Sequence, residues 1–326
     1  NEDANVYVDT LPQGPVSEYL MGMNMSYWRN IDQRWEGGVI ARRFKEINTS
    51  LLRWPGGGEV SGYHWQECPG TPKWKDAWEE DPASKYYFAD HNLCDRDIYM
   101  NIDEFLYWCY EVIGAEAAIG INYESGWRYD HLQDSIDEAV GLVEHCKNSG
   151  YDVKYYYIGN ETGAGFISDA NYAYVVRTFA EAMKAVDPDI HIMAYVPAKL
   201  GTQHIRDRYG TMLTQSDGHL ELLDAHFYWA RLIATWEKWL DQNPLLSEIH
   251  DYYGPPYVEE FENWYQDVNS LGVEAKLCAM EWSAGIPPAD TWEEDTMSAY
   301  KCAMVNSDMF MAFMNGGVHM ACLYPS

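Results

Sequence analysis

Two glutamates, each at the end of an apolar and aromatic run, are the side chains of this sequence best suited to chemistry. Glu161 ends the run 155–161 and precedes a glycine-rich stretch, and Glu281 follows the run 275–280. β-Branched and aromatic runs that stop at a glycine-containing loop are typical of buried strands. In an α/β barrel the loops after the strands build the active site, so both carboxyl groups are expected at one site.

Most enzymes that hydrolyse a glycosidic bond use a pair of carboxyl groups. A retaining glycosidase holds them roughly 5–5.5 Å apart, one uncharged to protonate the leaving oxygen and one ionised to attack the anomeric carbon. Glu161, flanked by glycines and the neutral Asn160, is expected to have the raised pKa of the acid/base. Glu281 is then the nucleophile, with Tyr228 and Arg53 near enough to keep it ionised.

The rest of the chain predicts the barrel that would position these groups. Strands are expected at 19–28, 50–54, 115–122, 155–161, 190–196, 222–228, 273–280 and 318–324, with seven helices between them. Such alternation means parallel pairing, and eight units mean closure into a (β/α)8 TIM barrel of the α/β class. An eighth helix is missing, which leaves an apolar flank that self-association or a further C-terminal domain would cover.

Two long aromatic loops and an N-terminal segment complete the predicted organisation. Residues 1–17 contain a strand outside the barrel, expected to belong to an accessory β-sheet domain, and 18–326 form the catalytic barrel. Loops at about 55–98 and 229–256 are rich in Trp and Tyr. Structureless loops of this length are usually lids or binding loops.

Aligning the predicted strand ends gathers more polar and aromatic side chains at the same mouth. These candidate substrate-binding residues are Asn24, Arg53, Asn122, Asn160, His226, Tyr228 and Trp282. A metal-dependent hydrolase would need clustered His and Asp ligands, and His226 is the only histidine expected there, so neither metal nor cofactor is predicted. A carbohydrate-binding barrel without catalysis is disfavoured because both glutamates are present.

Composition narrows the classes of partner. The 326 residues include 51 acidic and 22 basic ones, a formal charge of −29 that argues against binding nucleic acid. The 14 Trp and 26 Tyr suit stacking on sugars, although they are equally normal as half-buried core residues. No apolar run approaches the roughly 20 residues of a membrane span. The sequence fits a mature secreted or periplasmic protein and a cytoplasmic one alike.

Cysteine usage indicates buried thiols more than a disulfide framework. The seven cysteines show neither a CxxC nor a Cys/His metal spacing. If any pair is bridged, it is Cys68 with Cys94, because both fall in one long polar loop.

At the level of motifs, the sequence resembles clan A glycoside hydrolases. Gly159-Asn160-Glu161 and Glu281-Trp282 resemble the acid/base and nucleophile motifs of that clan. Within it, the stretches 52–57 (LRWPGG), 61–65 (SGYHW) and 224–228 (DAHFY) are similar to the family 51 α-L-arabinofuranosidases. The resemblance implies that Glu161 is the acid/base and Glu281 the nucleophile.

The resemblance also implies supporting roles and a substrate class. Asn160 would bond the sugar 2-hydroxyl, and Arg53 and Tyr228 would support the nucleophile. Trp54 and Trp65, which lie in the matching motifs, are further substrate-binding candidates. The expected function is that of an α-L-arabinofuranosidase-like retaining glycosidase acting on a polysaccharide or its oligosaccharides. The aromatic loops differ from those of that family and suit an endo-acting hydrolase of algal or plant-wall glycans, which is the alternative.

Overall fold

A computed structural model gives the fold of most of the chain. It describes residues 15–27, 35, 38–66, 100–128, 130–162, 167–197, 203–216, 218–229, 239–240, 249, 256–284 and 298–324. Most of the N-terminal strand segment, most of both aromatic loops, and Cys68 and Cys94 lie outside these residues.

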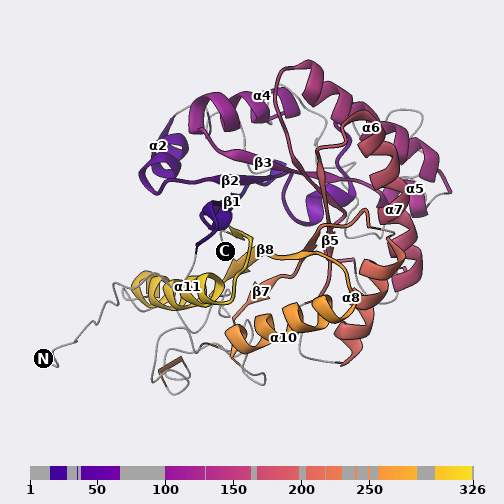
Figure 1. Ribbon diagram of the computed structural model, residues 1–326. Coiled ribbons are helices and arrows are strands. Elements are labelled where there is room, and N and C mark those ends of the chain that lie inside the picture. The colour runs from indigo at the N-terminus through magenta and orange to yellow at the C-terminus, as the bar shows by residue number, and fades with distance from the viewer. Residues whose placement is uncertain are drawn as a thin grey trace, which may run out of the picture.

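The described strands form one closed parallel barrel (Figure 1). They are β1 (Gly22–Asn24), β2 (Leu51–Trp54), β3 (Glu116–Ile121), β4 (Tyr155–Ile158), β5 (His191–Tyr195), β6 (Leu222–Asp224), β7 (Phe227–Tyr228), β8 (Lys276–Ser283) and β9 (Met320–Leu323). Neighbours in the chain pair in order, β9 returns to β1, and both β6 and β7 pair with β8. β6 and β7 are therefore two pieces of one barrel strand, and the predicted eight-stranded barrel is confirmed.

Helices surround this barrel on its outer side (Figure 1). The longer ones are α2 (Val39–Glu46), α6 (Leu132–Asn148), α7 (Asp169–Val186), α8 (Gln203–Gln215), α10 (Tyr257–Ser270) and α11 (Ser298–Asn315). α4 (Ile102–Tyr107) continues as the π-helical turn η5 (Trp108–Ile113), and α5 (Glu124–Arg128) is short. Two 3-10 turns, η1 (Glu18–Leu20) and η3 (Gly58–Ser61), lie before β1 and after β2.

Local chemistry explains several helix ends. The Ser168 side chain accepts a hydrogen bond from the Asn171 N–H and caps the start of α7. Asn101 and Glu104 form a capping box at the start of α4. The helix therefore begins at Ile102.

The expected strand positions hold, but three boundaries differ. β1 is shorter than the expected 19–28, because its first residues form η1, where the Ser17 side chain accepts a hydrogen bond from the Tyr19 N–H. β8 continues past Met280 to Ser283, because Trp282 pairs with both β7 and β9. The sixth strand breaks after Asp224, whose Oδ1 accepts the Met280 N–H at 2.9 Å.

Strand alternation sorts the core into two layers. The barrel interior holds a small cluster that includes Leu51, Tyr157, Met280 and Cys322. A much larger cluster fills the space between the strands and the helices. Side chains on one strand alternate between these layers, so the strand phase decides which residues reach the mouth. Among the described helices, none combines the length and apolar character that crossing a membrane requires.

Candidate active site

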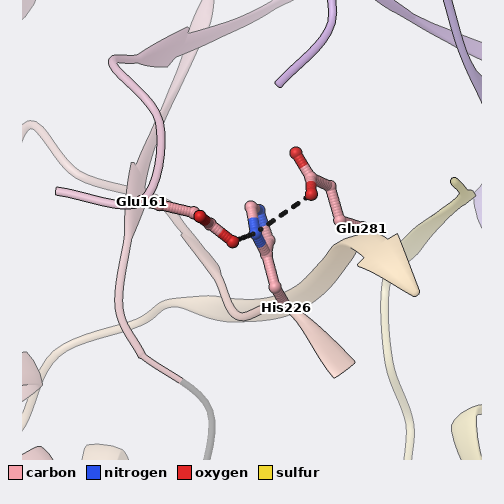
Figure 2. Close-up of side chains that lie close together, drawn as sticks. All are labelled: Glu161, His226 and Glu281. Carbon is pink, nitrogen blue, oxygen red and sulfur yellow. Dashed lines mark hydrogen bonds and ion pairs between the residues drawn. The ribbon is translucent and has the colours of Figure 1, made fainter. Parts of the chain in front are cut away.

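Glu161 and Glu281 meet at the mouth of the barrel with His226 between them (Figure 2). Glu161 follows β4, Glu281 lies in β8, and His226 lies between β6 and β7. The His226 Nδ1 is 3.1 Å from the Glu161 Oε1 and 3.5 Å from the Glu281 Oε2. One oxygen of each carboxylate and a nitrogen of the imidazole all lie within 4.8 Å of one another. The sequence had placed these groups at one mouth, and the structure brings them together.

Glu281 is buried among hydrogen-bond donors. Its Oε1 accepts a hydrogen bond from the Arg53 Nη1 at 2.7 Å, and its Oε2 accepts one from the Tyr228 hydroxyl at 2.5 Å. Burial alone would raise the pKa of Glu281, but the positive charges of His226 and Arg53, with these hydrogen bonds, lower it. Glu281 is therefore ionised at neutral pH, as a nucleophile requires.

Arg53 connects Glu281 with two asparagines. Its Nη1 donates to the Asn24 Oδ1 at 2.9 Å and its Nη2 to the Asn160 Oδ1 at 2.6 Å. The Asn24 Nδ2 donates in turn to the Met280 carbonyl at 2.8 Å. The guanidinium also lies over the Tyr157 ring, 4.4 Å from its centroid. Asn24 thus holds Arg53 from inside the barrel.

Glu161 differs from the expectation in its ionisation. Its side chain is 44% exposed, and the hydrogen bond from His226 is the largest influence on its pKa, which is lowered. The expected raised pKa is therefore wrong for the free protein, because a cation next to the carboxylate outweighs partial burial. Its backbone is also unusual, since φ is 43° and lies in the left-handed region.

His226 is a buried cation. Burial lowers its pKa, but the negative charges of Glu281 and Asp224 outweigh this and raise the pKa to about 10. The His226 Nε2 is 3.1 Å from the Asp224 Oδ2, and the Tyr195 ring meets the imidazole edge-on at 4.8 Å. His226 was expected to bind substrate directly, whereas here it bridges the two glutamates.

Sequence reasoning missed Asp224 and Gly57. Asp224 is two residues before His226 in the predicted strand 222–228, so period-two alternation could have placed it on the same face. A Cβ atom at Gly57 would lie 2.6 Å from the Glu281 Oε1, so this loop can approach the carboxylate only because residue 57 is glycine. The glycines after β2 signalled a loop but gave no sign of this contact.

Two of the tryptophans expected at the substrate lie elsewhere. Trp54 has 0% exposure and stacks on Phe105 of α4, with 5.0 Å between ring centroids. Trp282 packs against Phe310 and Phe313 of α11. These two expectations were wrong because each tryptophan follows an inward-facing residue and so faces the helix layer.

Trp65 and Asn122 have structural partners as well. The Trp65 Nε1 donates to the Glu138 carbonyl of α6 at 2.9 Å, and its ring lies against His145. Trp65 is half-buried, and its role in binding substrate stays a prediction. The Asn122 Oδ1 accepts the Ser125 N–H at 3.1 Å, so Asn122 caps the start of α5 at the end of β3.

Glu161, His226 and Glu281 have the residue types of a metal site. The imidazole is protonated at neutral pH, however, and the Arg53 guanidinium adds a second positive charge beside Glu281. A metal ion would have to displace the proton of His226 and bind next to the positive charge of Arg53. The arrangement therefore suits an ion-pair network better than a cation site.

The closed barrel and the paired glutamates place the chain among TIM barrels with two carboxylates at the mouth. A family model described as "Alpha-L-arabinofuranosidase 1 domain" matches residues 43–244, which is more than half of the chain. The chain belongs to this family. The matched range includes Arg53, Glu161 and His226 and ends before Glu281.

Individual relatives agree with this assignment. The chain is 28% identical over 171 residues to the "Probable alpha-L-arabinofuranosidase C" of Aspergillus terreus, an alignment that covers 46% of this chain and 30% of the fungal protein. It therefore spans less than a third of that relative's length.

Solved structures show the same fold. The α-L-arabinofuranosidase of Thermotoga maritima in complex with arabinose superposes with a TM-score of 0.60 at 20% identity, covering 95% of this chain and 64% of that one. A family 44 xyloglucanase of Paenibacillus polymyxa with xyloglucan superposes with a TM-score of 0.61 at 15% identity, covering 96% and 73%.

Proposed function

We propose that the protein is a retaining glycoside hydrolase of α-L-arabinofuranosidase-like specificity, acting on a polysaccharide or its oligosaccharides by double displacement. One observation carries the proposal. Glu281 is buried and held ionised by Arg53 and Tyr228, and one of its oxygens lies within 4.8 Å of a Glu161 oxygen. This proximity supports a retaining mechanism, because retaining enzymes hold their carboxyl groups roughly 5–5.5 Å apart and inverting enzymes need a wider gap.

In the first step a carboxylate oxygen of Glu281 attacks the anomeric carbon. The glycosidic bond breaks, and the leaving oxygen takes a proton from Glu161 to give a glycosyl-enzyme. The free protein holds its proton on His226, next to Glu161. A sugar covering the exposed carboxyl group would desolvate Glu161 and raise its pKa, which favours protonated Glu161 in the complex.

In the second step Glu161 acts as a base. It removes a proton from water, which attacks the anomeric carbon and releases Glu281. Two displacements at one carbon retain its configuration. Arg53 and Tyr228 stabilise Glu281 again as it leaves as a carboxylate.

The test combines substrate hydrolysis with chemical rescue of variants. Wild type, Glu281→Ala, Glu161→Ala and the exposed control Glu259→Gln are assayed on 4-nitrophenyl α-L-arabinofuranoside and on arabinan. We expect Glu259→Gln to match wild type and both site variants to lose at least about 100-fold in kcat/KM on arabinan, the lower end of what acid–base catalysis contributes. Azide should restore turnover of Glu161→Ala and give a glycosyl azide of retained configuration. An inverted first product from wild type, or full activity of Glu281→Ala, would refute the mechanism.

An endo-acting β-glycanase is the second candidate. It is favoured by the xyloglucanase, whose TM-score of 0.61 is similar to the 0.60 of the arabinofuranosidase. The abundance of Trp and Tyr also suits a polymer lying along a cleft. Mass spectrometry of products from arabinan, xylan, xyloglucan, β-glucan and agar separates the two, because release of arabinose alone indicates exo action and a ladder of oligomers indicates endo action. A polymeric substrate would place the enzyme outside the cytoplasm.

A further inference from the structure

The turn that carries Glu161 has an unfavourable backbone. Gly159 has φ 71° and Glu161 has φ 43°, both in the left-handed region. A residue with a Cβ atom in this region costs roughly 1–2 kcal/mol relative to a right-handed conformation. At Gly159 a Cβ atom would also lie 2.4 Å from the Tyr123 ring. The surrounding structure must therefore hold the turn in place.

Three side chains from neighbouring elements hold it. The Tyr172 hydroxyl of α7 donates to the Ile158 carbonyl at 2.6 Å, just before the turn. The Tyr123 hydroxyl donates to the Thr162 Oγ1 at 3.2 Å, just after it. The Arg208 Nη2 of α8 donates to the Thr162 carbonyl. The residue directly after Glu161 is thus held through its side chain and its backbone.

Arg208 is the charged member of these three donors. It is 1% exposed, and its Nη1 lies 3.2 Å from the Asp169 Oδ1 at the start of α7. Taking a guanidinium out of water is costly unless its hydrogen bonds are satisfied with good geometry. Both of its Nη groups are directed at this turn and at the helix that follows it. A buried cation placed in this way fixes the turn against α7 and α8 together.

We propose that Arg208 is a positioning residue for the acid/base: by fixing the backbone after Glu161 it keeps the Glu161 carboxyl group over the mouth. This inference rests on the role proposed for Glu161. Arg208 acts through the turn, whereas Glu281 accepts hydrogen bonds of its own from Arg53 of β2 and Tyr228 of β7.

The two glutamates should therefore respond differently to the loss of Arg208. Without it the Thr162 carbonyl loses a buried donor, and the turn can relax toward negative φ. The Glu161 carboxyl group would then move away, while Glu281 stays in place. Proton donation to the leaving oxygen should suffer, and nucleophilic attack should not. The defect should grow with the basicity of the leaving group.

The experiment measures that dependence. Arg208→Met and Arg208→Lys are assayed on phenyl and 2,4-dinitrophenyl glycosides of the sugar that wild type releases. For Arg208→Met we expect kcat/KM to fall about 10- to 100-fold on the phenyl glycoside, within the range of acid catalysis, and to change little on the dinitrophenyl glycoside, whose leaving group needs no proton. For Arg208→Lys we expect kcat/KM on the phenyl glycoside to lie between the values of Arg208→Met and wild type. Azide should raise kcat of Arg208→Met on the dinitrophenyl glycoside, because base catalysis of the second step is impaired.

Arg206→Met is the matched control. Arg206 lies on the same helix, but its Nε is paired with Asp267, 3.1 Å away, and the variant should match wild type. If Arg208→Met does not fold, Asp169→Asn keeps the guanidinium and provides the same comparison with a smaller effect. Equal losses on both glycosides, or no loss, would overturn the inference while leaving the proposed function intact. If wild type cleaves no glycoside, the proposed function fails and this inference falls with it.

Discussion

The buried charges at the mouth balance only when His226 is protonated. Arg53 and His226 are buried cations, and Glu281 and Asp224 are buried anions, with Glu161 at the edge as a third negative group. Neutral His226 would leave three carboxylates facing Arg53 alone. The imidazole thus stabilises the site through its contacts with all three carboxylates.

Tyr228→Phe tests how the nucleophile is kept ionised. The variant removes the hydroxyl that donates to the Glu281 Oε2 at 2.5 Å, so the pKa of Glu281 should rise. The acid limb of the kcat/KM profile should move to higher pH, and activity at neutral pH should fall about 10- to 100-fold, because a hydrogen bond to a charged group contributes roughly 1.5–3 kcal/mol. Tyr265→Phe is the control, since its hydroxyl donates to the Gly317 carbonyl away from the site. An unmoved acid limb in Tyr228→Phe would contradict this role.

The raised pKa of His226 predicts a loss of stability in alkali. Its folded-state pKa is about 10 against an ordinary value of 6.5, so the folded state binds the proton more tightly. The stabilisation is complete below about pH 6.5 and is lost as pH rises through about 10. The thermal midpoint of wild type should fall across this window, and that of His226→Gln should fall less. His204→Gln, an exposed change on α8, should follow wild type; parallel curves for all three proteins would count against the buried cation.

At the scale of single residues, the sequence predicted which residues form the site better than it predicted their protonation states. Glu161, Glu281, Arg53 and Tyr228 could be placed because each falls at or next to the end of a predicted strand. The lowered pKa of Glu161 could not be predicted, because its main determinant, His226, is 65 positions away in the chain. Contact between loops distant in sequence sets that pKa, and no local pattern encodes it.

Among the elements, strand phase separates site residues from core residues. Arg53 and Trp54 are consecutive on β2, and Glu281 and Trp282 are consecutive on β8. Consecutive strand residues face opposite sides, so both members of a pair cannot reach the mouth. Asn160 and Glu161 are an exception, because β4 ends at Ile158 and the left-handed turn directs both toward the site.

Trp54→Phe checks this assignment. A smaller ring leaves space in the layer between β2 and α4, so the free energy of unfolding should fall by about 1–3 kcal/mol. KM should stay within about twofold of wild type, because Trp54 has no exposed surface for a sugar to contact. Urea unfolding and steady-state kinetics on the same preparation give both values. A large rise in KM with unchanged stability would instead indicate that Trp54 binds substrate.

The loop after β2 should tolerate no side chain at Gly57. A methyl group there would lie 2.6 Å from the Glu281 Oε1, so Gly57→Ala must displace the nucleophile or the loop. We expect kcat/KM to fall about 100-fold, a loss typical of a small misplacement of reacting groups. Gly141→Ala in α6 is the control, because its nearest neighbour atom is 3.5 Å away. Wild-type activity in Gly57→Ala would show that the loop stands farther from Glu281.

The whole molecule shows why some features were visible in the sequence and others were not. The order of strands and helices fixed the barrel, since parallel strands joined by helices have few ways to close. The split of the sixth strand into β6 and β7 was not visible, because it depends on Asp224 bonding to the backbone of β8. Closure of the barrel creates that contact, and it exists in no shorter segment.

Net charge leads to a prediction for the molecule as a whole. With 51 acidic and 22 basic residues, the chain carries −29 at pH 7, and like charges on a compact surface repel one another. Salt screens this repulsion over about 10 Å at 0.1 M and about 3 Å at 1 M. The thermal midpoint at pH 7 should therefore rise between about 0.05 and 0.5 M NaCl.

Lowering the pH removes most of the net negative charge that causes this repulsion, and so it serves as the control. The sequence pI is about 4.5, so near pH 5 the net charge is small and the same salt step should raise the midpoint much less. The buried pairs at the mouth are shielded from salt, so screening acts on the surface and not on Arg53 and Glu281. An equal rise at both pH values would point to a general salting-out effect. If salt lowers the thermal midpoint at pH 7, then screening weakens stabilising surface ion pairs more than it relieves the repulsion between negative charges.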